Sequence, residues 1–200
     1  TAGKFEENPN RRLLEGKVIG SLFFEPSTRT RLSFETAANR LGARVIGFSD
    51  AATSSASKGE TLKDTIMMVS NYADLIVMRH HLEGAARYAS EISPCPVINA
   101  GDGAHAHPSQ GLLDLLTIRE KKGADLKGMK MAIIGDVLYS RVARTNIAAW
   151  TKLGADVHVA GPMTLMPYDI ESLGVTVHKR VEEALEGADV VDILRIQLER

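Results

Sequence analysis

Short apolar runs alternate with stretches of helical period along most of the chain, and this alternation limits the folds that the sequence can adopt. The apolar runs lie at 18–24, 44–48, 74–78, 96–99, 129–134, 156–160, 175–178 and 190–194. Between most of them lie amphipathic stretches of helix length, at 29–41, 61–72, 83–92, 109–121 and 141–153. Strands that alternate with helices predict βαβ units and mostly parallel sheets, whose strands are buried on both faces.

One break in this pattern indicates two domains. The stretch K-K-G-A-D-L-K-G at 121–128 ends a predicted helix, turns, and leads into a new predicted strand. We therefore predict two doubly wound α/β domains, residues 1–125 and 126–200. The second is short for an independent α/β domain, and the sequence stops just after a predicted strand, which would leave an exposed sheet edge. We expect the natural protein to be longer than these 200 residues.

The composition is that of a soluble globular protein. Hydrophobic residues make up 44% and charged residues 24%, and the formal net charge is -1, so nothing indicates nucleic acid or an anionic membrane as a partner. No apolar run approaches the ~20 residues of a membrane span, and the start of the chain does not resemble a signal peptide. Cys95 is the only cysteine, which excludes an intrachain disulfide. We expect a cytoplasmic protein.

The strongest motif is F-F-E-P-S-T-R-T-R at 23–31, which follows a predicted strand and opens a predicted helix. Ser27, Thr28 and Thr30 supply hydroxyl groups beside first-turn backbone N–H groups that have no partner within the helix. Together with the helix dipole and the planar guanidinium of Arg29, they form a candidate anion site. An ordinary helix N-cap is the alternative, but the density of hydroxyl and arginine side chains favours the anion site.

Three further segments of the first half carry candidate residues. T-S-S-A-S-K-G-E at 53–60, taken alone, is typical of a solvated linker. Arg79 follows the predicted strand 74–78, where open α/β sheets bind ligands, although a surface ion pair is an equally good interpretation. In G-D-G-A-H-A-H-P-S-Q, His107 precedes a predicted helix and could donate a hydrogen bond to a carbonyl oxygen. No cysteine or carboxylate set completes a metal site around His105 and His107, so we expect none.

Two motifs of the second half carry arginines. G-D-V-L-Y-S-R-V-A-R at 135–144 is again a strand–loop–helix, and because it is not G-x-G-x-x-G it gives no dinucleotide fingerprint. In L-R-I-Q at 194–197, Arg195 and Gln197 share one face of an extended segment. Trp150, Met67 and Met68 lie on helical faces and are predicted to be core residues.

These motifs, in this order, resemble the aspartate/ornithine carbamoyltransferase family over about residues 14–200. S-T-R-T-R with its F-x-E lead-in and H-P-S-Q are highly specific in combination. T-S-x-x-x-K-G-E, S-R-V-A-R and L-R-I-Q resemble the aspartate branch, because ornithine enzymes replace the arginines of the last two, and arginine suits a dicarboxylate acceptor. Ala106 and His81 stand where the family usually has Gln and often has Pro. Family chains are also longer at both ends.

The resemblance implies a carbamoyl phosphate-binding domain over 1–125 and an aspartate-binding domain over 126–200. It assigns the carbamoyl phosphate to Ser27, Thr28, Arg29, Thr30, Arg79, His107, Gln110, Ser54 and Lys58. Among these, Thr30, Arg79 and His107 are the catalytic residues that face the carbonyl oxygen, and Gln110 holds the carbamoyl amino group. The aspartate is assigned to Lys58, Arg141, Arg195 and Gln197. Ser54 and Lys58 would reach into the site of a neighbouring subunit of a homotrimer.

The implied reaction is transfer of the carbamoyl group from carbamoyl phosphate to the α-amine of L-aspartate, a step of pyrimidine biosynthesis, without a metal or organic cofactor. The resemblance leaves open whether regulatory chains attach. One alternative is a carbamoyltransferase for another amino acceptor, such as ornithine. Another is a non-catalytic structural homologue in a pyrimidine-pathway complex. A plain phosphate-binding module is a third, but it leaves Arg141 and Arg195 unexplained.

Overall fold

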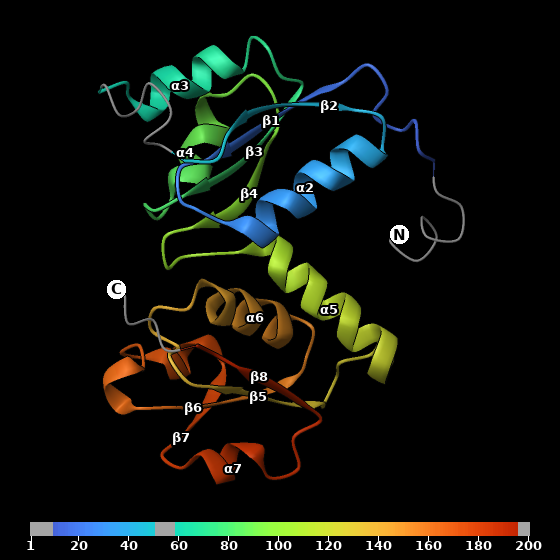
Figure 1. The fold of residues 1–200 in the computed structure, drawn as a ribbon. Coiled ribbons are helices and arrows are strands. Elements are labelled where there is room, and N and C mark those ends of the chain that lie inside the picture. The colour runs from blue at the N-terminus through green and yellow to red at the C-terminus, as the bar shows by residue number, and fades with distance from the viewer. Residues whose placement is uncertain (1–9, 51–58, 196–200) are drawn as a thin grey trace. The chain divides into compact units, whose positions relative to one another are not determined.

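The computed structural model describes residues 10–50 and 59–195, which fall into two compact units, Thr1–Asp102 and Gly103–Arg200. Each unit is a parallel sheet with helices on both faces (Figure 1), so the predicted fold class is confirmed. The boundary between the units lies between Asp102 and Gly103. It thus precedes the helix predicted at 109–121, which the sequence analysis placed in the first domain. The predicted assignment of binding roles to 1–125 and 126–200 stays a prediction, because compactness does not reveal which ligand a unit binds.

The first unit is built on four parallel strands in the order β2-β1-β3-β4. One core, with Phe23 and Val77, lies under α2, and the other, with Leu22, Ile76 and Met78, lies under α3 and α4. Successive residues of a strand point to opposite faces, which is why neighbours in sequence enter different cores. The elements are β1 (Val18–Phe23), α2 (Thr28–Arg40), β2 (Arg44–Phe48), α3 (Leu62–Val69), β3 (Leu75–His80), α4 (Ala85–Ile92) and β4 (Val97–Asp102).

The second unit repeats this plan with the strand order β7-β6-β5-β8, all parallel. Trp150, 1% exposed, lies in the large core between the sheet and helices α5 and α6. A smaller core of Ala132, Ala160 and Ala184 lies under α7. The elements are α5 (Pro108–Lys122), β5 (Lys130–Ile134), α6 (Arg141–Lys152), β6 (Asp156–Ala160), the 3-10 turns η3 (Met163–Leu165) and η4 (Ile170–Leu173), β7 (Val175–His178), α7 (Val181–Leu185) and β8 (Val190–Ile193).

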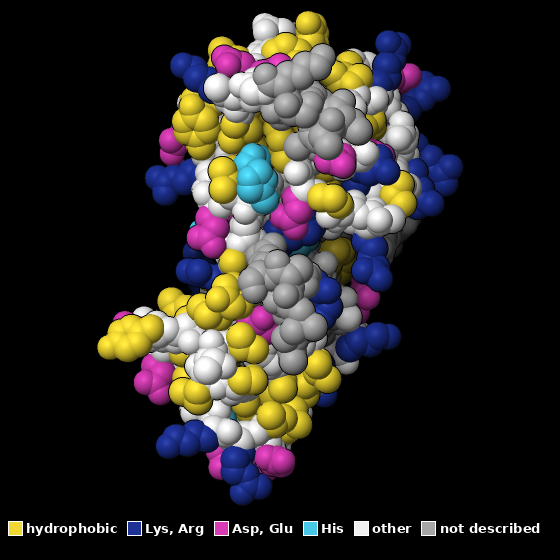
Figure 2. Space-filling model, turned by 60° about the vertical axis from the view of Figure 1, so that its left-hand side comes forward, with side chains coloured by type: hydrophobic (Ala, Val, Ile, Leu, Met, Phe, Trp, Pro, Cys, Tyr) yellow, Lys and Arg dark blue, Asp and Glu magenta, His cyan; other side chains and the backbone are white. Residues whose placement is uncertain are grey.

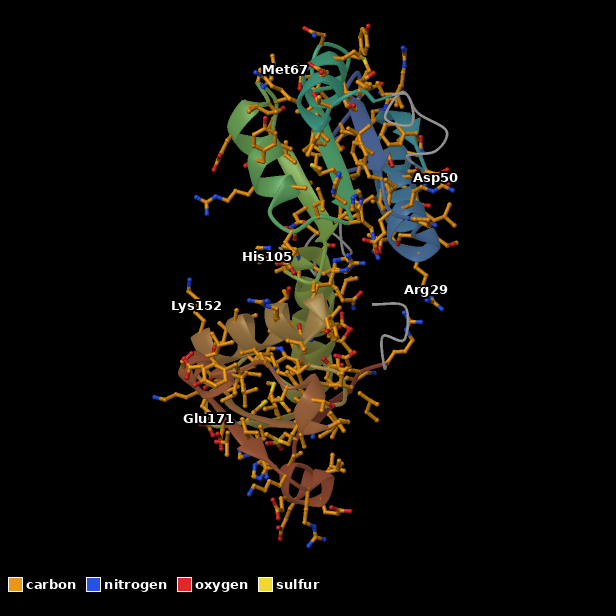
Figure 3. All side chains as sticks on the ribbon, turned by 90° about the vertical axis from the view of Figure 1, so that its left-hand side faces the viewer. Arg29, Asp50, Met67, His105, Lys152 and Glu171 are labelled. Atoms are coloured by element: carbon orange, nitrogen blue, oxygen red, sulfur yellow. The ribbon has the colours of Figure 1, made fainter. Side chains whose placement is uncertain are left out.

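The predicted strands and helices are confirmed, with ends that differ by no more than three residues. The sequence analysis missed η3, η4 and α7, which are too short to show a helical period. Trp150 is a core residue as predicted, but the prediction for Met67 and Met68 was wrong. Both are 43% exposed, and Figure 3 shows Met67 on the outer side of α3. Thr65, Ile66 and Val69 form the buried face of that helix instead.

Large hydrophobic side chains are exposed on both units (Figure 2). They include Tyr72 at 62%, Tyr168 at 101% and, on the edge strand β8, Ile193 at 78%. Single exposed apolar residues are normal on protein surfaces. None of the described helices is both long and apolar enough to cross a membrane.

Strand β2 approaches β1 so closely at Gly47 that no side chain fits there. A Cβ at Gly47 would lie 2.0 Å from the Ser21 carbonyl oxygen, and the residue has a φ of 143°. We expect Gly47→Ala to lower the free energy of unfolding by about 3 kcal/mol, because the strands must separate. Gly16→Ala is the matched control, since Gly16 has a φ of 79° with nothing within 4 Å of its Cβ position, and it should cost about 1 kcal/mol. Urea denaturation measures the free energy of unfolding of both variants. Equal losses would show that backbone strain alone explains the need for glycine at position 47.

Candidate active site

The motif at 23–31 and Arg79 meet because their strands are neighbours. After β1 the chain crosses to β2 on one side of it, while β3 lies on the other side. Crevices at such a reversal of strand order, outside the carboxyl ends, are where open α/β sheets bind ligands. The two strand ends are joined here by a hydrogen bond of 2.9 Å from the Phe24 N–H to the Arg79 carbonyl oxygen. The loop after β1 therefore runs directly beside the end of β3.

The Arg79 guanidinium is the centre of a polar cluster at this point. Its Nη1 donates to Ser27 Oγ at 3.1 Å and lies 3.5 Å from Thr30 Oγ1. Its Nη2 pairs with Glu25 Oε1 at 3.1 Å, and the Arg79 side chain is only 12% exposed. Ser27 is the N-cap residue of α2, yet its side chain makes no capping hydrogen bond. The ordinary N-cap interpretation therefore does not explain this hydroxyl, and the cluster has the donors of an anion site.

Thr28 and Arg29 belong to the first turn of α2, next to Ser27 and Thr30. Both are exposed, and Figure 3 shows the Arg29 side chain directed away from the helix. Glu25, by contrast, was not singled out from the sequence as a site residue. Its place in F-x-E-P-S-T-R was a signal, since a carboxylate beside so many cationic and hydroxyl groups needs a partner.

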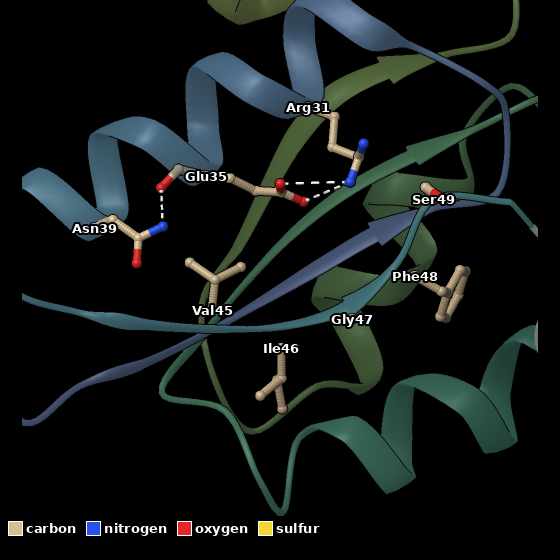
Figure 4. A pocket seen from close by; sticks show the side chains of 8 residues that line it. All are labelled: Arg31, Glu35, Asn39, Val45, Ile46, Gly47, Phe48 and Ser49. Atoms are coloured by element: carbon tan, nitrogen blue, oxygen red, sulfur yellow. Dashed lines mark hydrogen bonds and ion pairs between the residues drawn. The ribbon is translucent and has the colours of Figure 1, made fainter.

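A separate pocket of about 500 Å³ lies between α2 and the edge strand β2 (Figure 4). On its α2 side, Glu35 accepts a hydrogen bond from Ser21 Oγ at 3.0 Å and pairs with Arg31 at 3.4 Å. Val45 to Ser49 line the opposite side. Because Ser27, Thr30 and Arg79 are not among its lining residues, this pocket is distinct from the predicted anion site.

In the second unit, His107 is the N-cap residue of α5, as the sequence predicted, and it is 6% exposed. Its backbone N–H donates to Thr145 Oγ1 of α6 at 2.8 Å, and its ring Nδ1 lies 3.3 Å from Ser109 Oγ. Arg141, at the start of α6, is buried and donates from Nη1 to the Gly103 carbonyl oxygen at 3.0 Å. These contacts therefore join the loop before α5 to the first turns of α5 and α6.

A hydrogen-bonded chain that the sequence analysis missed runs from α5 through α6 to β8. Gln110 Nε2 donates to Asp114 Oδ1 at 2.9 Å, and Asn146 Nδ2 donates to Asp114 Oδ2 at 2.8 Å and to Asp192 Oδ2 at 3.0 Å. Burial raises the pKa of Asp192, and the Asp114 charge adds to this, whereas the hydrogen bond from Asn146 lowers it. The four-residue spacing of Gln110 and Asp114 on one helix face was the available signal.

The second sheet has its own reversal of strand order, between β5 and β8. Arg195 follows β8 there and is exposed, while the loop after β5 leads to Arg141. The other predicted site residues, Ser54, Lys58 and Gln197, lie outside the described residues. Within residues 10–50 and 59–195, no group of three His, Cys, Asp or Glu side chains could hold a metal ion.

Comparison with known protein families shows which family the chain belongs to. Residues 1–120 match the family described as aspartate/ornithine carbamoyltransferase, carbamoyl-P binding domain. The chain belongs to the aspartate/ornithine carbamoyltransferase family.

Its relatives include the aspartate carbamoyltransferase catalytic subunit of Bacteroides fragilis, 55% identical over 100% of this chain and 67% of the relative. That of Halothermothrix orenii is 57% identical over 94% of this chain and 59% of the relative. The chain thus spans roughly two thirds of such relatives.

Solved structures agree with the family. The aspartate transcarbamoylase of Trypanosoma cruzi in complex with carbamoyl aspartate and phosphate matches with a TM-score of 0.85 and 36% identity, over 100% of this chain and 68% of that one. The catalytic subunit of M. jannaschii aspartate transcarbamoylase matches with a TM-score of 0.82 and 41% identity, over 100% and 68%.

His80, next to Arg79, gives the first unit a pH-dependent stability. Burial, followed by the neighbouring charge of His81, lowers the pKa of His80 to about 4, although Glu25 and Asp102 oppose the shift. Its Nδ1 also accepts a hydrogen bond of 2.9 Å from the Leu82 N–H, which requires an unprotonated nitrogen. The folded state therefore favours neutral His80.

Because the unfolded chain takes up a proton near pH 6.5 and the folded chain only near pH 4, stability is lost as the pH falls through this window. We expect the free energy of unfolding of the wild type to drop there by roughly 2 kcal/mol more than that of His80→Gln, after discounting for solvent screening. Urea denaturation at pH 7, 5 and 4 measures this. Parallel curves for the two proteins would exclude His80 as the cause.

Proposed function

We propose that the protein transfers the carbamoyl group of carbamoyl phosphate to the α-amine of L-aspartate, giving N-carbamoyl-L-aspartate and phosphate, a step of pyrimidine biosynthesis. The observation that carries this proposal is the cluster of Ser27, Thr30 and Arg79 at the reversal of strand order in the first sheet. The acceptor follows from the relatives, which are named for aspartate, and from the arginines at 141 and 195.

The phosphate is assigned to the cluster and the first turn of α2. Ser27, Thr28 and Thr30 offer hydroxyl donors, Arg29 an exposed cation, and Arg79 a guanidinium fork held by Ser27 and Glu25. Glu25 occupies part of that fork at 3.1 Å. A phosphate dianion carries more charge and more acceptor oxygens than the carboxylate, so we expect it to displace Glu25 from Arg79.

The carbonyl oxygen is assigned to Thr30, Arg79 and His107. We assign the Ser109 hydroxyl as the donor to His107 Nδ1 at 3.3 Å, which places the ring N–H on Nε2 and makes His107 a donor there. Gln110 is assigned to the carbamoyl amino group. These groups then stabilise the oxyanion that forms when the amine adds to the carbonyl carbon, an effect of roughly 3 kcal/mol for one well-placed donor.

The chemistry itself needs few groups. The neutral α-amine of aspartate attacks the carbamoyl carbon, a tetrahedral intermediate forms, and its collapse breaks the bond to the phosphate oxygen. The leaving phosphate takes up the proton that the amine loses. Arg141 and Arg195 hold the two carboxylates, and the main gain comes from orienting two anions that would otherwise repel each other.

The remaining assignments are also proposals. We assign the protein to the cytoplasm and to a homotrimer in which Ser54 and Lys58 of one subunit complete the site of its neighbour. Lys58 and Gln197 are further assigned to aspartate.

Arg79→Lys tests the central residue, since it keeps the charge but loses the planar fork. In the full-length protein we expect kcat to fall by roughly a hundredfold and the affinity for phosphate to weaken, because both the phosphate and the oxyanion lose a donor. Arg87→Lys is the matched control, because Arg87 also pairs with a glutamate at 3.1 Å but is 84% exposed. Formation of N-carbamoylaspartate is the readout. A normal kcat with only a raised KM would remove Arg79 from the transition state.

Shared sites can be tested by mixing two inactive variants. Lys58→Ala and His107→Ala homotrimers should each be nearly inactive. After dissociation and reassembly, each mixed trimer contains one junction of intact His107 with intact Lys58, so recovery should approach about a quarter of the wild-type specific activity for equal mixing. If verified subunit exchange restores nothing, Lys58 does not complete a neighbour's site.

A further inference from the structure

The side-chain amide of Gln110 is held in one orientation by Asp114. Gln110 is in the first turn of α5, and Asp114 lies one turn further along the same face. Gln110 Nε2 lies 2.9 Å from Asp114 Oδ1 and must be the nitrogen end of the amide, because an amide oxygen there would face a carboxylate oxygen. The other end, Oε1, is therefore the end that a ligand N–H can meet.

Asp114 is in turn fixed by Asn146, a side chain with no exposed surface. One Asn146 N–H donates to Asp114 Oδ2 and the other to Asp192 Oδ2, at 2.8 and 3.0 Å. The Oδ1 of Asn146 is buried without a hydrogen-bond partner in the described part of the chain. The carboxylates thus decide the orientation of this amide even at the expense of an unpaired carbonyl oxygen. Both oxygens of Asp114 are consequently occupied by amide donors.

We propose that Asp114 is a positioning residue that presents Gln110 Oε1 to the carbamoyl amino group, and that it thereby makes the site select acyl phosphates bearing an N–H over those bearing a methyl group. This inference rests on the proposed function. A methyl group in the place of the amino group offers no donor and leaves Oε1 unpaired. A flipped Gln110 would instead place its own N–H against the N–H of the substrate.

A purely structural role, as a tie between α5 and α6, is the competing explanation. Both roles predict a loss of stability when Asp114 is changed, so stability does not separate them. Only the positioning role predicts a change in the preference between two ligands that differ by NH2 and CH3 alone.

The test uses such a pair, phosphonoacetamide and acetonylphosphonate, with dissociation constants measured by titration calorimetry on the full-length protein. The wild type should favour the amide roughly tenfold, the value of about one hydrogen bond. Asp114→Asn should remove most of this preference, because an asparagine cannot accept from both Gln110 and Asn146 with one oxygen each. The ratio of two constants from one sample does not depend on the fraction of folded protein.

Two control variants complete the design. Glu120→Gln neutralises an exposed carboxylate on the same helix and should leave the ratio unchanged. Gln110→Ala should remove the preference as Asp114→Asn does, and the double variant should lose no more than Gln110→Ala alone, because the two residues act in series.

The outcomes are distinct. Equal weakening of both ligands by Asp114→Asn, or a further loss of preference in the Gln110→Ala background, overturns the positioning role and leaves the proposed function intact. Equal binding of both ligands by the wild type also overturns the positioning role and leaves the proposed function intact. A wild type that binds neither overturns the proposed function and this inference with it. Should Asp114→Asn fail to fold, NMR of the wild type decides, since loss of the Gln110–Asp114 hydrogen bond on binding phosphonoacetamide contradicts the inference.

Discussion

The parallel pairing of β1 with β3 is the constraint on which the proposed anion site depends. The register pairs Phe23, the last residue of β1, with Arg79 of β3. The loop after β1 therefore begins beside Arg79. The order β2-β1-β3-β4 reverses at this pair, the place in open α/β sheets beyond whose strand ends ligands bind. Residues 52 positions apart, Ser27 and Arg79, are thereby joined at 3.1 Å. On the other side of β1, Gly47 supports the same strand order, because its lack of a side chain lets β2 approach β1 closely.

The pairing of Arg79 with Glu25 follows from the burial of the Arg79 side chain. A guanidinium that is 12% exposed cannot be left without a counter-charge, and Glu25 supplies one at 3.1 Å. The same carboxylate weakens the field that attracts a phosphate. The proposed binding of phosphate would therefore exchange one anion for another, which favours ligands with more charge or more acceptors than a carboxylate.

The sequence predicted the fold well because period and burial agree along the chain. Strands such as β2, β6 and β7 were predicted to the residue, whereas α7, with five residues, has no period to detect. The candidate site was predictable where a motif concentrates donors, as in Ser27 and Thr30. It was not predictable where a partner lies far away in sequence, as for Asp192, 46 residues from Asn146. Met67 and Met68 show the remaining ambiguity, since an apolar residue on a helix faces the core only if the helix axis is placed correctly.

The second unit joins residues assigned to both substrates through one hydrogen-bonded chain. Gln110, assigned to the carbamoyl group, is linked through Asp114 and Asn146 to Asp192, which lies three residues before Arg195, assigned to aspartate. Burial raises the pKa of Asp192, and the hydrogen bond from Asn146 opposes this shift. Among the described strands β8 pairs with β5 alone, and the hydrogen bond between Asp192 and Asn146 also ties it to α6. The hydrogen bonds therefore link Gln110 to the strand that ends shortly before Arg195, within a single unit of the fold.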